Sequence, residues 1–279
     1  MTWPLLYRKP ECLCRIDPEL ETILEADRVL QFANLAQDRL VDEARRAGLR
    51  LRRAVSGDMD LITDLLGRCF LPDTPSLENQ YSLHLILTYG YAAVLESPGG
   101  RLEGCNICAG YDDPDRTAFG IRVAVDQAAG GRNLGALLVS YTSLEGMKRG
   151  ARLRRGLLSP TNFGSGANFL NHVGYLGESY HPCLPSFGPR FVVVLPLTPA
   201  GIGNNRIDQE KMLEFIDQGE PEKDYRLIDC ENLDLISDTY NNTDFRVAAF
   251  VKKGMLSDRN QLLALAKSAL RFPEAPKKN

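Results

Sequence analysis

The sequence predicts an α/β fold in which a mixed, mostly antiparallel central sheet is flanked by helices. Segments with the period-two alternation of strands are interspersed with segments that carry apolar residues at helical spacing. Three of the strand segments follow one another with only short turns between them, as in an antiparallel meander. The last of these strands leads through a glycine-rich loop into an apolar helix, and this set of elements is typical of an α/β domain.

The composition is that of an ordinary globular protein. The chain has 279 residues, of which 44% are hydrophobic and 25% charged, and its formal net charge is −3. The longest apolar run, 191–197, is far shorter than the roughly 20 residues of a membrane helix. The N-terminus lacks the apolar core of a secretory signal, and proteins that coat DNA are usually far more basic. We therefore expect a cytoplasmic protein that neither spans a membrane nor binds DNA.

The seven cysteines are an odd number without a repeated spacing, which favours reduced thiols and no metal. Cys105 and Cys108 lie in a predicted strand, where residues three apart face opposite sides of the sheet and do not converge on one ion. We therefore interpret them as small buried hydrophobic side chains. A zinc site built from this pair together with Cys12 and Cys14 is the alternative.

Residues 1–48 form a predicted N-terminal helical extension. Asp17 and Pro18 suit the start of a helix, Gly48 suits its end, and apolar residues recur between them at helical spacing. One face of this long helix, or of two shorter ones, is expected to pack on the rest of the protein. The extension carries no evident chemistry.

Residues 49–198 form the predicted α/β core. Alternating residues predict its first strand at 49–55, and a helix follows from Ser56 to about Phe70. The remaining core elements are, in order, a helix at 77–89, strands at 91–96, 101–111 and 117–125, the loop 128–133, a helix at 134–149, a strand at 153–158, a helix at 164–173 that Gly174 ends, and a buried strand at 191–197.

Residues 199–279 form a predicted C-terminal α+β extension of unassigned role. A proline- and glycine-rich stretch, 198–205, is typical of a linker. After it we expect a helix near 208–218, a strand near 245–252 and a helix near 258–270. The sequence leaves open whether this segment is an appended domain or an elaboration of the core sheet.

The glycine-rich loop is the most informative segment for chemistry. A strand ends at Val125, glycines follow at 130 and 131, and an apolar helix begins near Leu134. Glycines let the backbone approach a ligand closely, and the free N–H groups at a helix start bind phosphate. The loop therefore predicts a pyrophosphate cradle. It contains neither the lysine of a P-loop nor the G-x-G-x-x-G of a dinucleotide site.

In these residues the sequence resembles the GNAT acyltransferase superfamily, over about 49–198. The family has a V-x-P strand, then R-G-x-G-x-G, then a helix with paired leucines. Val125, Gly131, Arg132 and Gly135 match that motif, and the leucines of the helix fall at 134, 137 and 138. Further on, the family has a strand, an asparagine and a helix that ends in a tyrosine, a glycine and an aromatic residue. Their counterparts here are Asn162 after the strand 153–158, and Gly174-Tyr175.

Several positions depart from the family pattern. The residue that opens the loop, Arg or Gln in the family, is Gly130 here, and the middle glycine is Asn133. Asparagine is one of the few residues besides glycine that tolerates a positive φ. The helix tyrosine that protonates the departing thiolate is replaced by Leu170, and Asn162 is one residue out of the usual spacing from Gly174. The cradle is therefore altered but usable, and the family's general acid is missing.

The resemblance implies transfer of an acyl group from a thioester, usually acetyl-CoA, to the amine of a small metabolite or amino-acid-like acceptor. The loop N–H groups would hold the pyrophosphate, and the strand edge would pair with the pantetheine arm and polarise the thioester carbonyl. The residues that the resemblance assigns to CoA are Val123, Val125, Gly130, Gly131, Arg132, Asn133, Leu134, Gly135, Ala136 and Asn162.

A base must also take a proton from the incoming ammonium group. His181 is a candidate, because the segment 177–183 is expected to be the loop that lines the acceptor pocket in this fold. His172 is a second candidate, on the helix near the place where the thiol would leave. Tyr180 is a candidate acid.

Two arginine-rich runs, 45–53 and 148–155, leave the donor open. We interpret them as solvated helix ends and edge strands. They also fit a patch for a polyanionic donor, which would be an acyl carrier protein or an aminoacyl-tRNA. A further hypothesis is an acyl-CoA-binding or regulatory module without catalysis, which the missing tyrosine favours. Whether the chain forms a homodimer stays open.

Overall fold

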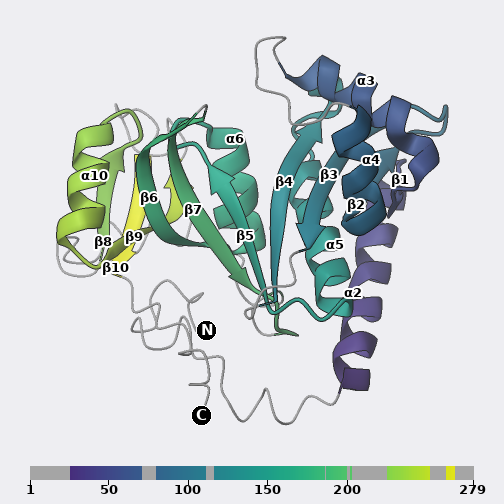
Figure 1. Ribbon diagram of the computed structural model, residues 1–279, viewed down its shortest axis with the longest axis horizontal. Helices are drawn as coiled ribbons and strands as arrows, with labels where there is room; N and C mark the ends of the chain where they lie inside the picture. The colour runs from purple at the N-terminus through teal and green to yellow at the C-terminus, as the bar shows by residue number, and fades with distance from the viewer. Residues whose placement is uncertain are drawn as a thin grey trace. The chain divides into compact units, whose positions relative to one another are not determined.

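The computed structural model describes residues 26–70, 80–110, 116–185, 187–199, 202, 225–251 and 262–267 (Figure 1). The chain divides into two compact units. Among the described residues, those within 26–155 and 197–199 form the N-terminal unit, and those within 156–196, 202, 225–251 and 262–267 form the C-terminal unit. The boundary falls inside strand β5 (Leu153–Leu158).

The central sheet has seven strands in the order β1-β2-β3-β4-β5-β7-β6 and is mostly antiparallel. Its first four strands are β1 (Arg50–Arg53), β2 (Tyr91–Glu96), β3 (Leu102–Gly110) and β4 (Thr117–Val125). A tight turn joins β2 to β3, where the Gly100 N–H donates to Ser97 O at 2.9 Å. The predicted meander and the predicted α/β class with a mixed, mostly antiparallel sheet are confirmed.

Helices cover both faces of this part of the sheet. Short η3 (Ser56–Asp58) leads into α3 (Met59–Cys69), which lies with α4 (Gln80–Tyr89) against one face. The core on that side contains Ile62, Leu65, Leu83, Ala92, Val94, Cys105 and Ile107. Cys108 belongs to a separate cluster with Tyr91 and Ala118. The two thiols of β3 are therefore buried in different clusters, and Cys108 Sγ also accepts a hydrogen bond from Arg154 at 3.2 Å.

The opposite face is covered by α5 (Leu134–Lys148), and α2 (Ala26–Arg46) packs on α5 and β1. Gly146 allows α5 to lie close to the sheet, because a Cβ there would be 2.5 Å from Tyr91 Oη. Lys148 Nζ donates to Gln37 Oε1 at 2.9 Å, which joins α5 to α2. The residues of the predicted N-terminal extension before 26 lie outside the described residues.

The C-terminal unit contains the antiparallel pair β6 (Leu176–Leu184) and β7 (Gly188–Pro196). The helical segment before them consists of α6 (Phe163–Gly166) and η5 (Ala167–Val173), a π-helix. A second sheet has three antiparallel strands in the order β8-β10-β9. These strands and their helix are β8 (Tyr225–Asp229), α10 (Leu233–Asn242), β9 (Phe245–Val251) and β10 (Leu262–Lys267).

Specific contacts attach this second sheet to η5 and β6. The buried Asn171 side chain pairs with both backbone groups of Phe250: Nδ2 donates to Phe250 O at 2.8 Å, and Oδ1 accepts from Phe250 N at 2.9 Å. The Tyr240 hydroxyl accepts from the Val247 N–H at 2.9 Å. Burial raises the pKa of Tyr240 above its ordinary value. Within this unit, the described part of the C-terminal extension is therefore packed directly on the second half of the core.

Three sequence expectations about local structure need correction. The segment 177–183, expected as a loop, belongs to β6, and the helix expected near 258–270 contains strand β10. β6 is the last strand of its sheet, where Pro182 is tolerated because an edge position needs fewer ladder bonds. β10 lies between β8 and β9, so pairing on both sides overrides the helical propensity of its leucines and alanines. β8 and α10 were not predicted, and the expected helix near 208–218 lies outside the described residues.

Candidate active site

The loop between β4 and α5 has the conformation of an anion-binding turn. Asp126 ends the strand and caps η4 (Gln127–Ala129), where the Ala128 N–H donates to Asp126 Oδ1 at 3.0 Å. Gly131 has φ 79° and Asn133 has φ 54°, so both lie in the left-handed region. Asparagine at 133 thus adopts the positive φ for which it is suited. α5 begins at the next residue.

The first N–H groups of α5 have no hydrogen-bond partner in the described part of the chain. Among the described residues, the N–H groups of Leu134, Gly135 and Ala136 donate no hydrogen bond, and the first bond into the helix runs from Leu137 N to Asn133 O at 3.1 Å. The Asn133 side chain forms no cap. Successive N–H groups across a left-handed and a right-handed residue form a concavity that binds anions, and the helix dipole adds positive potential. The loop can therefore hold a phosphate group.

The other predicted loop residues differ in their contacts with the rest of the protein. Gly130 and Gly131 are exposed, and a Cβ at Gly131 would meet no atom within 4 Å. The Arg132 guanidinium donates to the carbonyl oxygens of Ala129 at 3.3 Å and Ala47 at 3.2 Å. It thereby ties the loop to the chain just after α2.

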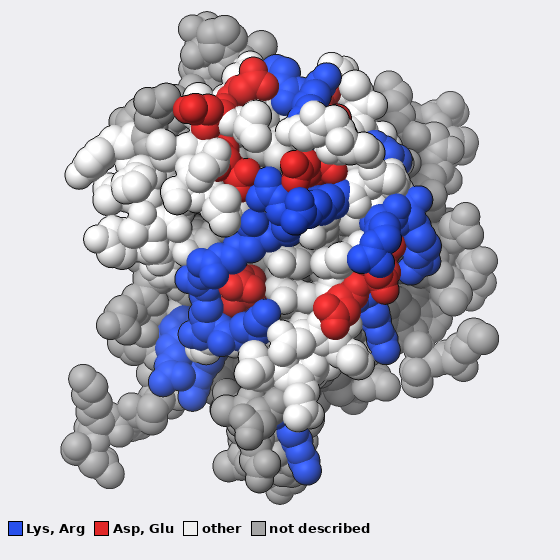
Figure 2. Space-filling model, turned by 90° about the vertical axis from the view of Figure 1, so that its right-hand side faces the viewer, with Lys and Arg blue, Asp and Glu red and all other residues white. Residues whose placement is uncertain are grey.

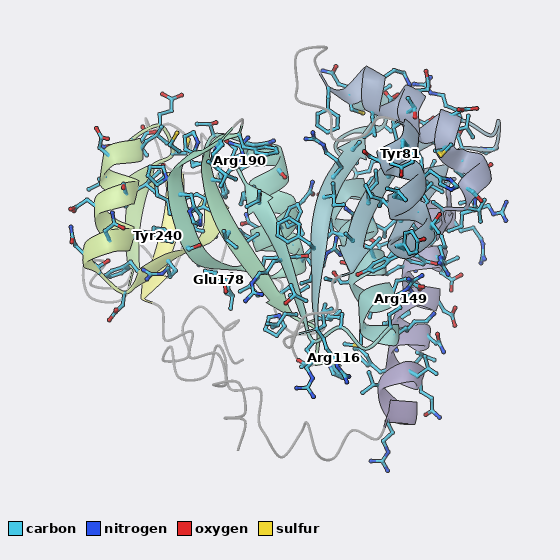
Figure 3. All side chains as sticks on the ribbon, in the orientation of Figure 1. Tyr81, Arg116, Arg149, Glu178, Arg190 and Tyr240 are labelled. Atoms are coloured by element: carbon cyan, nitrogen blue, oxygen red, sulfur yellow. The ribbon has the colours of Figure 1, made fainter. Side chains whose placement is uncertain are left out.

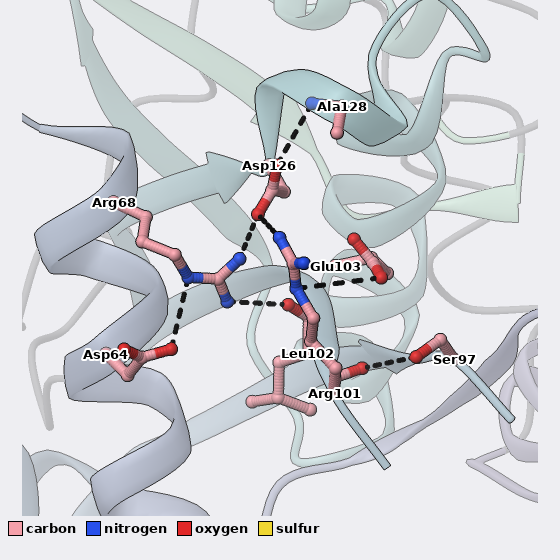
Figure 4. Close-up of polar contacts among 8 residues, drawn as sticks. All are labelled: Asp64, Arg68, Ser97, Arg101, Leu102, Glu103, Asp126 and Ala128. Carbon is pink, nitrogen blue, oxygen red and sulfur yellow. Dashed lines mark hydrogen bonds and ion pairs between the residues drawn. The ribbon is translucent and has the colours of Figure 1, made fainter. Parts of the chain in front are cut away.

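Asp126 is the centre of an ion cluster beside the loop (Figure 4). Arg68 on α3 donates to Asp126 Oδ2 and, at 3.1 Å, to Leu102 O. Arg101, in the turn before β3, donates to the same carboxylate oxygen. The Ala128 N–H and the two guanidinium groups hold the pKa of Asp126 below its ordinary value. The carboxylate is therefore ionised at neutral pH and already paired, which does not suit a general base.

Val123 and Val125 lie half-buried at the end of β4. One edge of this segment is occupied by β3, with Val123 opposite Asn106 and Val125 opposite Gly104. The two valines thus lead directly into the loop, in the positions that the resemblance assigns to the pantetheine arm.

In the C-terminal unit, Asn162 acts as a helix cap, since its Oδ1 accepts from the Ser165 N–H at 3.0 Å. The π-helical winding of η5 explains the offset of Asn162 from Gly174, because a π-helix takes one more residue per turn. Leu170, at the position of the family's tyrosine, is fully buried, and Tyr175 packs edge-on against Phe169 at 4.9 Å between ring centroids. His172 lies half-buried in the last turn of η5.

Tyr180 and His181 are neighbours on β6 and lie on opposite sides of the strand. The Tyr180 ring packs against Phe191 and Tyr240, with centroids 5.2 Å and 5.8 Å away (Figure 3 labels Tyr240). Its hydroxyl is buried and has no partner among the described residues, and burial raises its pKa. His181 is exposed, with Nε2 at 3.3 Å from Ser179 Oγ. The structure therefore does not bring these two side chains together.

The arginine run 148–155 is not a continuous surface patch, because Arg154 is fully buried under α5. One terminal nitrogen donates to Val139 O at 2.6 Å and to the hydroxyls of Thr142 and Ser143, each at 2.7 Å. The other donates to Asn106 Oδ1 at 2.5 Å. The same nitrogen also donates to Cys108 Sγ at 3.2 Å. All of these acceptors are uncharged. The expectation that Arg154 belongs to a patch for a polyanionic donor was wrong, because β5 turns this side chain inward.

The remaining basic side chains are largely paired with acids. The single carboxylate of Glu145 has ion-pair contacts with three basic side chains: Arg53 at 3.9 Å, Lys148 at 3.7 Å and Arg149 at 3.5 Å. Arg149 is labelled in Figure 3. Arg45 pairs with Asp42 at 2.7 Å. On the face of the molecule drawn in Figure 2, basic side chains form a band with acidic side chains among them. These pairs offset much of the positive charge of both runs.

Sequence reasoning missed Arg68 and Arg101 as contributors to the site. Arg68 and Arg101 are 58 and 25 residues away from Asp126 in the chain. No local pattern connects residues at such separations. The one feature of the sequence that could have indicated this ion cluster is Asp126 itself, an acidic residue directly between a strand and a glycine loop. Among the described residues, no group of three or more His, Cys, Asp or Glu side chains is placed to hold a metal ion, and no helix is long and apolar enough to span a membrane.

Comparison with known proteins finds similarity in structure but not in sequence. No model of a protein family matches the chain, and no curated protein matches it. One similar structure is the NatC complex bound to Gag peptide and CoA, at 13% identity over 54% of this chain and 99% of that chain, with a TM-score of 0.47. Another is the ribosomal-protein-S18-alanine N-acetyltransferase from Escherichia coli, at 15% identity over 54% and 94%, with a TM-score of 0.45.

A third similar structure is a spermidine N-acetyltransferase chimera that includes the Vibrio cholerae sequence, at 12% identity over 54% of this chain and 96% of that chain, with a TM-score of 0.45. In this chain, the β2-β3-β4 meander, the loop with two left-handed residues and the helix that follows it agree in order with the motif quoted above. The described part of the chain therefore has a mixed α/β fold with the order of elements that the GNAT resemblance implied.

Proposed function

We propose that the protein is an N-acyltransferase that moves an acyl group from an acyl-CoA, with acetyl-CoA as the first choice, to the amine of a small acceptor. One observation carries the proposal: the N–H groups of Leu134, Gly135 and Ala136 have no partner among the described residues. They lie at the start of a 15-residue helix, behind a loop with two left-handed residues. Such a site matches the pyrophosphate of CoA in charge and in hydrogen-bond donors.

The chemistry requires few protein groups beyond this binding site. The neutral amine attacks the thioester carbonyl carbon, and its nitrogen then gives up a proton to a base or to water. The C–S bond breaks, and the thiolate of CoA takes a proton from an acid or from water. Holding both reactants in line supplies much of the rate enhancement. A backbone N–H near Val123 or Val125 would stabilise the oxyanion that develops on the carbonyl oxygen.

The first test is the melting temperature of the purified protein with acetyl-CoA, with CoA and with pantetheine. A ligand at 100 times its Kd stabilises a protein by about 2.7 kcal/mol, which raises the Tm by several degrees. We expect this rise with both CoA compounds and little with pantetheine, which lacks the pyrophosphate. An equal rise with ADP would show only general affinity for phosphate, and no rise with acetyl-CoA would refute an acyl-CoA donor.

His181, His172 and Tyr180 remain our proposed proton-transfer residues. His181 ranks first because its ring is exposed on β6, where an incoming amine can reach it. If His181 is the base, His181→Ala removes the acidic limb of the pH–rate profile, because an imidazole must be neutral to accept a proton. A profile that keeps its shape in this variant would transfer the assignment to His172 or to water.

A second candidate function is CoA binding without catalysis. The position of the family's tyrosine holds the fully buried Leu170, and its neighbour Asn171 is engaged with Phe250. A melting-temperature rise with CoA but no acyl transfer to any amine in a broad panel would favour this candidate.

A further inference from the structure

We propose that Asp126, Arg68 and Arg101 form a positioning device that sets the conformation of the loop and thereby its affinity for CoA. The three residues are called the Asp126 cluster below. The inference rests on the proposed function, since it gives the cluster a role in binding the acyl donor. None of the three residues is assigned to touch the ligand.

The first argument is convergence. One carboxylate receives hydrogen bonds from α3 through Arg68, from the turn before β3 through Arg101, and from the loop itself through the Ala128 N–H. Arg68 also holds Leu102 O at 3.1 Å and lies 3.1 Å from Asp64. The cluster therefore connects the first residue after β4 to two other parts of the N-terminal unit (Figure 4).

The second argument is that the position of Asp126 fixes the backbone of the turn that follows it. The Asp126 side chain is 9% exposed, and the Arg68 and Arg101 side chains are 29% and 54% exposed. The next two hydrogen bonds of the loop follow from the position of Asp126, because Ala129 N donates to Asp126 O at 2.9 Å and Gly130 N donates to Gln127 O at 3.1 Å. Gly131 and Asn133 come directly after this turn. A shift of Asp126 would therefore move the unpaired N–H groups of α5.

The third argument is electrostatic. Asp126 lies five residues before Gly131, and a bare carboxylate near an anion site would repel a pyrophosphate. The two guanidinium groups pair with it, so its charge is offset where the donor would bind. Glu103 lies 3.9 Å from Arg101, so the cluster as a whole is not a cationic site for the phosphate. Its role is to hold and neutralise the start of the loop.

The chain offers a matched control at the other end of α3. Asp58 is 4% exposed, and both its carboxylate oxygens accept from Arg52 at 2.7 Å. It also accepts from the Val55 N–H at 2.8 Å, and the Arg52 guanidinium lowers its pKa. Asp58 and Asp126 are thus the same kind of paired helix-start carboxylate, and only Asp126 adjoins the loop.

The experiment compares Asp126→Ala, Asp126→Asn and Asp58→Ala in the full chain. The Kd of CoA is measured by calorimetry, and hydrogen exchange is followed in peptides that cover 127–137. We expect Asp126→Ala to raise the Kd by about tenfold, which corresponds to about 1.4 kcal/mol of binding free energy. It should also accelerate exchange at Ala129, Gly130 and Leu137. Asp126→Asn keeps an acceptor for the Ala128 N–H and should lie between. Asp58→Ala should lower the Tm but leave the Kd and the loop exchange unchanged.

Arg101→Gln is a milder variant in case Asp126→Ala does not fold, and it should raise the Kd a few-fold. If turnover is found, the KM for the acyl-CoA should follow the Kd while kcat stays nearly constant. Equal effects of Asp126→Ala and Asp58→Ala on the Kd or on loop exchange would overturn the inference. Failure of the wild-type protein to bind CoA would refute the proposed function instead, and the exchange data would still decide whether the cluster positions the loop.

Discussion

Arg154→Met should destabilise the protein by roughly 3 kcal/mol or more, because several buried acceptors lose their donor. The reason lies in the uncharged acceptors around the guanidinium, which include two hydroxyls of α5, the buried amide oxygen of Asn106 and the Sγ of Cys108. Each buried acceptor that loses its donor costs about 1 to 3 kcal/mol. Methionine fills part of the volume but donates nothing.

The measurement is urea unfolding of the wild type, Arg154→Met and Arg152→Met. Arg152 is exposed two residues earlier in the chain, so its replacement should change the free energy of unfolding by less than about 0.5 kcal/mol. A loss below about 1 kcal/mol for Arg154→Met would show that the network contributes little to stability. A large loss would mean that any variant that replaces Arg154 tests folding rather than a donor patch.

Asn133→Val should raise the Kd of CoA by about tenfold or more, while Asn133→Gly should keep it within about twofold. At φ 54° the backbone of Asn133 is left-handed. A residue with a branched Cβ pays about 1 to 2 kcal/mol or more in that conformation, whereas glycine pays nothing. Valine would therefore shift the loop to another conformation and disperse the N–H groups of Leu134, Gly135 and Ala136.

Two measurements separate binding from folding in this pair of variants. Calorimetry with CoA gives the Kd, and the melting temperature without ligand gives the strain in the free protein. We expect valine to lower the melting temperature relative to glycine whether or not CoA binds. If both variants bind CoA as the wild type does, the loop is not the pyrophosphate site, even if the protein binds CoA elsewhere.

The sequence predicted the elements around the loop because their signals are local. A strand that ends in Val125, two glycines and an apolar helix need no distant residue to be recognised, and the left-handed Asn133 follows from the chemistry of asparagine. The same is true of the meander, whose turns contain the residues that tight turns require. It is also true of the helix end at Gly174, where φ is 91°.

Elements whose form depends on neighbouring strands could not be recognised in this way. β10 has a sequence of leucines and alanines that suits a helix, and it is a strand because β8 and β9 pair with it on both sides. The π-helical winding of η5, with Gly174 N donating to Phe169 O at 3.0 Å, is equally invisible in the residue pattern.

By itself, the sequence determined the α/β class, the meander and the strand, loop and helix around the glycines, since periodicity, turn residues and backbone conformation act over a few residues. Only the tertiary structure decided which charged side chains surround Asp126 and that Arg154 is buried. It also decided that Asn171 holds Phe250. These contacts join residues up to 79 positions apart, and their partners are selected by packing, which no local pattern encodes.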